Sequence, residues 1–327
     1  MNRKVTKVIK YLLSFILAGV LVWFAFRELN WQEFLNGLKE TRWGYVVLFT
    51  LVSVLALVAR EERWKIMMEP LDPGVKRIDA WDASNVGNLI NVVLPGAGEF
   101  VRCGYIKTAR MGYDKTLGTV FCERAWDVIA VVIMLLVALL LQWKSLGGFF
   151  IDNIWHPFVG NAGFSLWWII APLLVLLAVF IWGVFHWQKK YKWCRRIADT
   201  VRGLGAGITS FVHIRRKGLF VLYTLAIWIL YLLMTYYTFK AIPALDHLTF
   251  MDSLFVSGIG NIASIIPVPG GMGAYHYLVA ITLENIYGAS WEISLLFATL
   301  SHETHAFLII LLGIISYVRV SLLRKKR

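Results

Sequence analysis

Residues 117–141, LGTVFCERAWDVIAVVIMLLVALLL, decide the fold class of this chain. The second half of this stretch has no charged residue and is rich in Val, Ile and Leu. At about 1.5 Å per residue, a helix of this length crosses a hydrocarbon core roughly 30 Å thick. Its first half nevertheless contains Glu123, Arg124 and Asp127. The stretch therefore predicts a membrane-spanning helix that carries ionisable groups.

The whole chain has the composition of an integral membrane protein. Of its 327 residues, 58% are hydrophobic and 16% are charged, and its mean hydropathy is +0.65. These values are too apolar for a soluble domain of this length. We predict an all-α, polytopic integral membrane helical bundle that forms a single transmembrane domain over residues 1–327, with about six full spans. The predicted full spans are residues 8–26, 43–59, 117–141, 164–187, 219–239 and 291–318.

Two further segments, residues 79–98 and 252–288, are apolar but interrupted by proline and glycine. The first ends in PGAG at residues 95–98, and the second has PVPGGMG at residues 267–273 near its middle. The two halves of the second segment are each too short to cross the bilayer. Both segments are predicted to be re-entrant hairpins, which enter the membrane and return to the same side.

The distribution of Lys and Arg orients the chain, because cytoplasmic loops carry an excess of these residues. With a cytoplasmic N-terminus and two re-entrant hairpins, the basic loops at 60–115 and 189–217 both lie in the cytoplasm. Of the chain's 33 Lys and Arg residues, the outer loops then hold Arg27, Lys39, Arg42, Lys144 and Lys240. We predict a multi-pass protein of the cytoplasmic (inner) membrane with both termini in the cytoplasm. Topology explains the formal charge of +13, and no nucleic-acid partner is expected.

In this arrangement the first hairpin enters from the cytoplasm and the second from outside. The hairpins share a sequence pattern, in which GN at residues 87–88 precedes PG at 95–96, and GN at 260–261 precedes PG at 269–270. Opposite orientation together with this similarity favours an inverted repeat over chance recurrence. In transporters, such repeats place the substrate site near the midplane, between discontinuous helices. The two repeats comprise about residues 43–141 and 219–318.

Ionisable residues follow the first break. Glu123 and Asp127 share a helical face at i, i+4, and Arg124 lies within i, i+3 reach of Asp127. An isolated charge at membrane depth costs about 2.5–3.5 kcal/mol on insertion scales, so these groups are expected to pair or to face water. They form either a substrate site or a structural clamp, in which Arg124 pairs with Asp127 and Glu123 pairs with an arginine of another helix. The candidate translocation residues of this half are Pro95, Gly96, Glu99, Arg102, Glu123, Arg124 and Asp127.

The second break is followed by His276 and by HETH at residues 302–305 of the last span. His302 and His305 share a face at i, i+3, a spacing that also suits a metal. Glu303 is expected to project from another face, so a polar lining or an interhelical hydrogen-bond cluster is favoured and neither metal nor cofactor is predicted. The candidate residues of this half are Pro269, Gly270, Gly271, His276, His302, Glu303 and His305.

The string REERWK at residues 60–65 marks the predicted cytoplasmic end of the second span. Basic residues with Trp at this level bind lipid headgroups or anchor the helix, and anchoring is the favoured interpretation. The sequence shows no nucleophile–base pair, phosphate-binding loop or complete set of metal ligands. Catalytic residues are therefore not predicted, and an enzyme is the least favoured class.

Three ordered stretches resemble a known family: NVVLPGAGEFVR at residues 91–102, ERAWD at 123–127 and PVPGGMG at 267–273. As a set they resemble the lysylphosphatidylglycerol synthase transmembrane, or flippase-like, family over nearly the whole chain. The resemblance implies movement of an aminoacylated phospholipid between leaflets. His276 stands where the family commonly has Glu, and the soluble domain of the aminoacyl-transferring members is not expected here. The resemblance therefore extends to the transport half and not to lysyl transfer.

The leading hypothesis is a lipid flippase or translocase that moves a phospholipid or related lipid between leaflets, with membrane lipids as its partners. Arg102 and Arg124 would face phosphate, and the carboxylates would face a cationic headgroup or a proton. Two alternatives stay open. One is a small-solute or ion transporter on the same scaffold, and the other is a non-transporting membrane subunit that binds a lipid-modifying enzyme.

Overall fold

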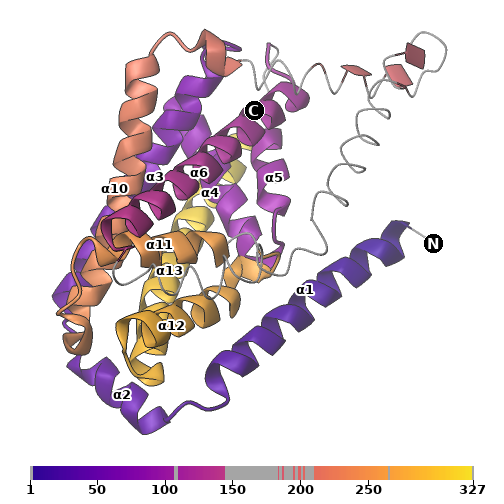
Figure 1. Cartoon of the computed structure of the whole chain (residues 1–327). Coiled ribbons are helices and arrows are strands. Elements are labelled where there is room, and N and C mark those ends of the chain that lie inside the picture. The colour runs from indigo at the N-terminus through magenta and orange to yellow at the C-terminus, as the bar shows by residue number, and fades with distance from the viewer. Residues whose placement is uncertain are drawn as a thin grey trace.

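The computed structural model describes residues 3–106, 110–143, 210–263 and 266–325, with isolated residues between 183 and 202. The regular structure of these ranges is helical, which confirms the predicted all-α class (Figure 1). The α-helices are α1 (Arg3–Phe26), α2 (Trp31–Glu40), α3 (Trp43–Met68), α4 (Arg77–Val93), α5 (Ala97–Tyr105), α6 (Tyr113–Leu141), α10 (Lys217–Ala241), α11 (Asp252–Ala263), α12 (Ala274–Tyr287) and α13 (Trp291–Lys325). Short 3-10 turns are η2 (Ser210–His213), η3 (Pro243–Leu245) and η4 (Pro269–Gly271).

Four of the described helices, α3, α6, α10 and α13, are long and apolar enough to cross a membrane. They correspond to four of the predicted full spans. A part of α1, Leu13–Phe26, qualifies together with α2 as a pair bent by 85°. The described residues thus contain four or five candidate spans, as expected of a multi-pass membrane protein. The predicted span at 164–187 lies almost entirely outside the described residues.

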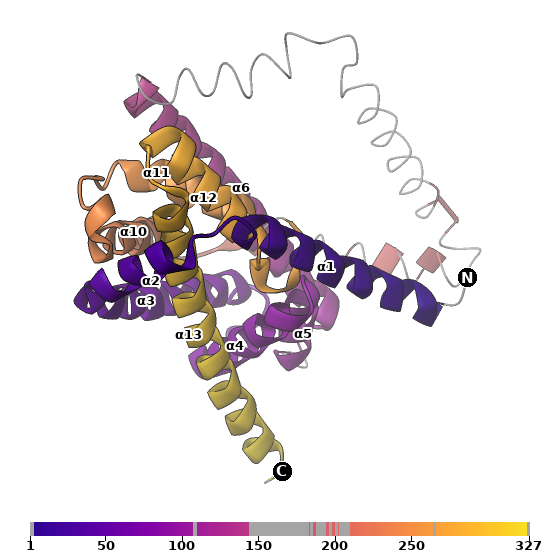
Figure 2. The same ribbon diagram turned by 90° about the horizontal axis from the view of Figure 1, so that it is seen from below.

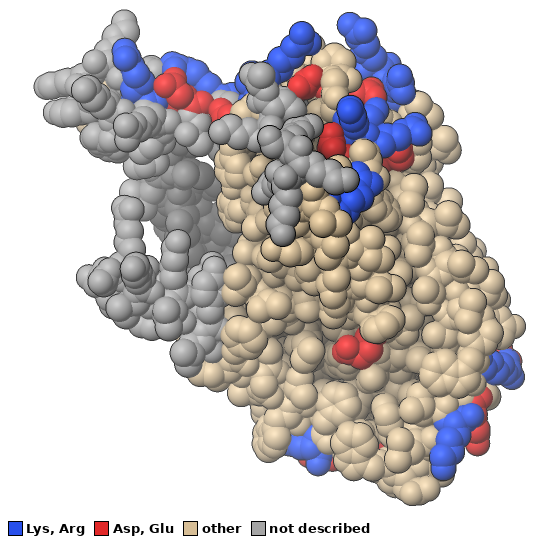
Figure 3. Space-filling model, turned by 180° about the vertical axis from the view of Figure 1, so that it is seen from behind, with Lys and Arg blue, Asp and Glu red and all other residues tan. Residues whose placement is uncertain are grey.

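The surface of the spans is apolar. Leu140 of α6 and Phe307 of α13 have exposed fractions of 75% and 70%. Figure 3 shows Lys and Arg gathered towards the two ends of the molecule, with a broad band of other residues between them. Soluble proteins rarely expose so large an apolar area, whereas acyl chains solvate it in a bilayer.

A buried core joins the elements of the second half. Phe239 of α10, Leu283 of α12 and Phe297 of α13 are fully buried within it. The rings of Phe239 and Phe297 lie 5.1 Å apart between centroids. Phe34 of α2 packs into the same core, so α2 is fixed to α10, α12 and α13. Along its other side α10 lies beside α3, and this pair joins the two halves of the chain (Figure 1).

The first Pro-Gly break separates α4 from α5, and the two helices fold into a hairpin. Gly96 has φ +73°, a left-handed conformation that glycine adopts without strain. The side chain of Asn91 accepts a hydrogen bond from Gly98 N at 2.7 Å. The backbones are so close that a Cβ on Gly98 would lie 1.9 Å from the carbonyl oxygen of Gly87. This pair of helices extends to Tyr105, beyond the predicted end at residue 98, because α5 continues after the break.

The second break separates α11 from α12 and contains the turn η4. Gly270, Gly271 and Gly273 have φ of +60°, +80° and +79°, so the backbone here requires glycine. A Cβ on Gly273 would lie 2.8 Å from Val22 N, which shows how closely α1 crosses the turn. The segment matches the predicted 252–288, because α11 starts at Asp252 and Gly288 follows the end of α12.

The two breaks meet inside the bundle. A Cβ on Gly270 would lie 3.6 Å from the carbonyl oxygen of Val92, the penultimate residue of α4. Both hairpins also pack on α13, where Gly313 lies against Leu89 of α4 and α12 lies alongside (Figure 2). The order of long helix, broken pair and long helix occurs twice, as α3 to α6 and as α10 to α13. The tips of the two broken pairs thus share one region of the structure.

Replacing Gly98 by alanine is expected to destabilise the first hairpin, because the methyl group would overlap the Gly87 carbonyl and the Asn91 side chain. Overpacking typically costs about 1–3 kcal/mol, so the unfolding temperature of the purified protein should fall. Gly104→Ala is the matched control, since a Cβ there meets nothing within 4 Å in the same helix. An unchanged unfolding temperature for Gly98→Ala would contradict the close approach.

Candidate functional site

Ionisable side chains from three helices form a buried charged cluster beside the first break. The helix α3 contributes two arginines, α5 follows the break directly, and α6 is the long span that carries Glu123. The members of the charged cluster are Arg60, Arg63, Glu99, Arg102, Glu123, Arg124 and Asp127. The structure therefore brings together all five ionisable residues that were predicted for this site.

Glu123 lies at the centre of the cluster, and its side chain is fully buried. Its Oε2 lies 2.7 Å from Nη2 of Arg102. Its Oε1 lies 3.3 Å from Nε of Arg60 and 3.6 Å from Nη2 of Arg63. One carboxylate thus binds arginines from α3 and α5, which satisfies the requirement that charges buried in a membrane be paired.

The remaining acids complete the network around Glu123. Nη2 of Arg63 lies 2.6 Å from Oδ1 of Asp127, and Nη2 of Arg102 lies 2.8 Å from Oε2 of Glu99. Arg124 pairs with Glu99 and lies 3.6 Å from Oδ2 of Asp127. Arg124 is 41% exposed, whereas Arg63 is fully buried, so the cluster runs from the interior to an accessible edge.

The prediction that the string at 60–65 only anchors α3 is wrong. The helix continues nine residues past the predicted end at Ala59, as far as Met68, and buries Trp64 and Met67 completely. Arg60 and Arg63 lie at i, i+3 and point to the same partner, Glu123. That spacing, which puts both arginines on one face of the helix, is the signal that could have identified them.

Several polar atoms of the cluster have no protein partner in the described residues. These atoms are Nε and Nη1 of Arg63 and Nε of Arg102. A buried donor or acceptor without a partner costs about 1–3 kcal/mol, so such atoms mark places where water or a ligand binds favourably. Guanidinium groups suit phosphate and carboxylate oxygens, because their planar N–H donors can bind two oxygens at once.

The second group of predicted residues gathers at the second break. Nε2 of His302 lies 2.9 Å from the carbonyl oxygen of Gly270, and its Nδ1 lies 3.0 Å from Oε1 of Glu303. Nε2 of His276 lies 3.6 Å from the same carboxylate oxygen. The expectation that Glu303 projects away from the histidines is wrong, because its side chain bends back to His302.

His305 does not join this group through any contact in the described residues. Its Nδ1 lies 2.7 Å from Oγ of Ser53, so it links α13 to α3 instead. Pro269 and Gly271 belong to η4, and a Cβ on Gly271 would lie 3.7 Å from Nε2 of His302. Pro95 and Gly96 form the first break, three residues before Glu99. The predicted residues therefore fall into two groups, with His305 apart.

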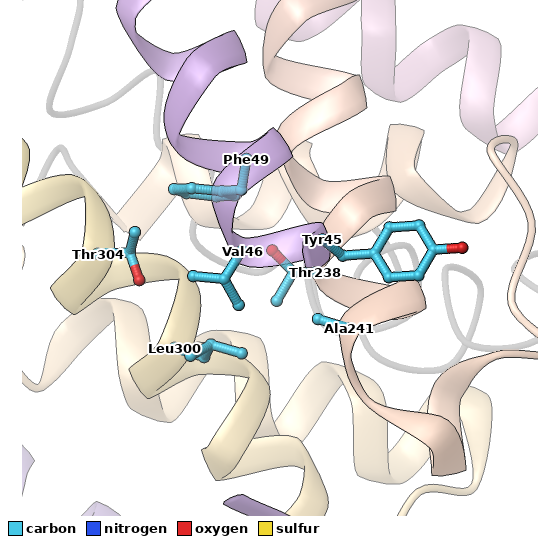
Figure 4. Close-up of a pocket in the computed structure, with 7 residues that line it drawn as sticks. All are labelled: Tyr45, Val46, Phe49, Thr238, Ala241, Leu300 and Thr304. Atoms are coloured by element: carbon cyan, nitrogen blue, oxygen red, sulfur yellow. The ribbon is translucent and has the colours of Figure 1, made fainter. Parts of the chain in front are cut away.

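Two hollows lie near these groups. The crevice in Figure 4 lies between α3, α10 and α13 and has no space for a water molecule. Its lining residues are Tyr45, Val46, Phe49, Thr238, Ala241, Leu300 and Thr304. A larger cavity of about 360 Å³ lies between α2, α3 and α13, with Glu303 on its otherwise uncharged wall. The crevice is a packing seam, whereas the cavity reaches Glu303 of the second group.

These features define a polytopic helical membrane protein with two broken helix pairs and a charged cluster inside the bundle. Residues 11–313 match the family profile described as "Lysylphosphatidylglycerol synthase TM region", and the chain belongs to this family. It is also 27% identical over 139 residues to the UPF0104 membrane protein PH1989 of Pyrococcus horikoshii. That alignment covers 40% of each chain. The comparisons identified the TM region without a catalytic domain, and no solved structure matched.

Removing one partner of the central ion pair should destabilise the protein more than removing both. Glu123→Gln leaves the guanidinium of Arg102 buried and only partly paired, and breaking a buried pair in this way costs about 3–5 kcal/mol. The double variant Glu123→Gln/Arg102→Gln should regain part of the lost unfolding temperature. Glu28→Gln, which removes the exposed pair with Arg27, is the control and should change little. Additive losses in the double variant would contradict the pairing.

Proposed function

We propose that this protein is a lipid translocase, which moves a phospholipid or related lipid between the leaflets of the cytoplasmic membrane. The observation that carries the proposal is the buried charged cluster beside the first helix break. Groups of both signs inside a membrane bundle complement a headgroup that has a phosphate and a cationic part. The family description supports this, since lysylphosphatidylglycerol is a phospholipid with such a headgroup.

In this proposal, different charged groups of the cluster bind different parts of the headgroup. Arg102 and Arg63 have unpaired buried N–H groups, which would bind phosphate oxygens. Arg124 is the most exposed arginine of the cluster and would meet the phosphate first. Glu99 and Asp127, each 20% exposed, would bind a cationic headgroup. Binding would exchange arginine–carboxylate pairs for headgroup pairs, so no charge is left unpaired.

The arrangement of the helices supports a transport cycle. We infer that α3 to α6 and α10 to α13 are inverted repeats, and that the broken pairs α4–α5 and α11–α12 enter the bilayer from opposite sides. Support comes from the repeated element order and from the contact between the two breaks. Irregular backbone at membrane depth occurs where protein or a water-filled cavity satisfies it, as at the substrate sites of transporters.

The proposed orientation can be tested with single cysteines at Arg110 and His247, both exposed. The background replaces the three native cysteines by alanine. Because a re-entrant pair returns to its own side, a membrane-impermeant maleimide added outside should label His247→Cys and spare Arg110→Cys until the membrane is opened. Labelling of Arg110→Cys from outside would mean that α4–α5 crosses the bilayer once, and would reject the re-entrant arrangement.

Lipid movement can be measured with the purified protein in liposomes that contain fluorescent phosphatidylglycerol, its lysyl ester or phosphatidylethanolamine in one leaflet. We expect movement above protein-free liposomes for at least one lipid. Arg63→Lys keeps the charge but removes the planar donors, so it should slow movement roughly tenfold or more. The control Arg27→Lys changes an exposed ion pair and should retain the wild-type rate.

The outcome also separates the alternative functions. Solute uptake without lipid movement would favour a transporter on the same scaffold. A stoichiometric lipid-modifying enzyme that copurifies with the protein, with Glu123→Gln still able to bind it, would favour a non-transporting subunit. Absence of movement for every lipid in the panel would reject the translocase.

A further inference from the structure

His276, Glu303 and His302 converge at the second break from two helices. Their ligand atoms all lie within 4.8 Å of one another, and the described residues hold no other group of three potential ligands this close. His276 is 3% exposed and His302 is 13% exposed, so both imidazoles are shielded. The hydrogen-bond chemistry of the group determines what it can bind.

The contacts of His302 fix the position of its proton. A carbonyl oxygen only accepts hydrogen bonds, so Nε2 of His302 must carry the hydrogen that it donates to Gly270. The neutral ring then has a lone pair at Nδ1, which lies 3.0 Å from the carboxylate oxygen Oε1 of Glu303. Two acceptors at this distance repel each other unless a proton or a metal ion lies between them.

His276 directs a third ligand atom to the same place. Its Nε2 lies 3.6 Å from Oε1 of Glu303, and it comes from α12 rather than α13. In a tetrahedral zinc site with bonds of about 2.0–2.1 Å, neighbouring ligand atoms are roughly 3.3 Å apart. The observed separations of 3.0 and 3.6 Å lie on either side of this value.

The surroundings also resemble those of a metal site. Metal-binding histidines almost always donate their other N–H to a carbonyl or carboxylate, as His302 does to Gly270. The cavity of about 360 Å³ reaches Glu303, which is 49% exposed, and so offers an entry path and room for a further ligand such as water.

We propose that His276, His302 and Glu303 bind one divalent transition-metal ion of the Zn²⁺ type. Imidazole and carboxylate are ordinary ligands of such ions. The ion would join α12 to α13 and, through the hydrogen bond from His302, hold the glycine turn η4 in place. The expectation of no metal rested on Glu303 pointing away, and its contact with His302 removes that reason. The proposal is independent of lipid movement.

The test uses the full chain in detergent, purified without a histidine tag and stripped of metal with a chelator. Isothermal titration with Zn²⁺ should give one site per chain, and Co²⁺ should give the visible absorption of a tetrahedral complex. His276→Ala, His302→Ala and Glu303→Gln should each weaken Zn²⁺ binding roughly tenfold or more. His305→Ala is the matched control, because that half-buried histidine of the same helix binds Ser53 instead.

Thermal unfolding provides a second measurement. Zn²⁺ should raise the unfolding temperature of the wild type and of His305→Ala, since a ligand that binds the folded state stabilises it. It should not raise that of Glu303→Gln, a substitution of similar size. Failure of the wild type to bind Zn²⁺ or Co²⁺ at one per chain, or equal loss in His305→Ala, would overturn the proposal. A proton shared between Glu303 and His302 would then account for their contact.

Discussion

The pairing of Glu123 with three arginines is the interaction on which the first half of the structure depends. A carboxylate buried in a membrane bundle must be matched by a cation, and here the cations come from α3 and α5. Because Glu123 lies on α6, this one group ties together three elements that are separate in the sequence. The break before α5 is thereby held beside the charges.

The need of backbone groups for hydrogen-bond partners imposes a second constraint, at the helix breaks. Where a chain stops being helical inside a membrane, its N–H and C=O groups need other hydrogen-bond partners. At the first break the Asn91 side chain accepts from Gly98, and at the second His302 donates to Gly270. Each solution needs glycine, at Gly98 for the close approach of Gly87 and at Gly270 for a positive φ.

The sequence was sufficient to predict features that depend on composition, on the backbone restriction of proline and glycine, and on the spacing of residues along a helix. Hydropathy predicts the four long spans, and the backbone restriction of proline and glycine predicts both breaks. Helical spacing predicts the ion pair between Arg124 and Asp127 of α6. The sequence did not predict the contacts of Arg60 and Arg63, because a hydropathy profile ends a span where charges begin. The helix α3 continues past that point because its charges are paired. The sequence also failed for Glu303, since a spacing rule gives the direction of Cβ but not the bend of a long side chain towards His302.

The two halves differ in what holds their breaks, and this difference has a mechanical consequence. Moving α5 away from α6 would separate Glu123 from Arg102, and disrupting a buried ion pair costs about 3–5 kcal/mol. Moving η4 away from α13 would break the neutral hydrogen bond from His302 to Gly270, whose net contribution is about 0.5–1.5 kcal/mol. Of these two interactions, the one that holds η4 is the weaker. An ion bound at His276, His302 and Glu303 would add a further link between α12 and α13.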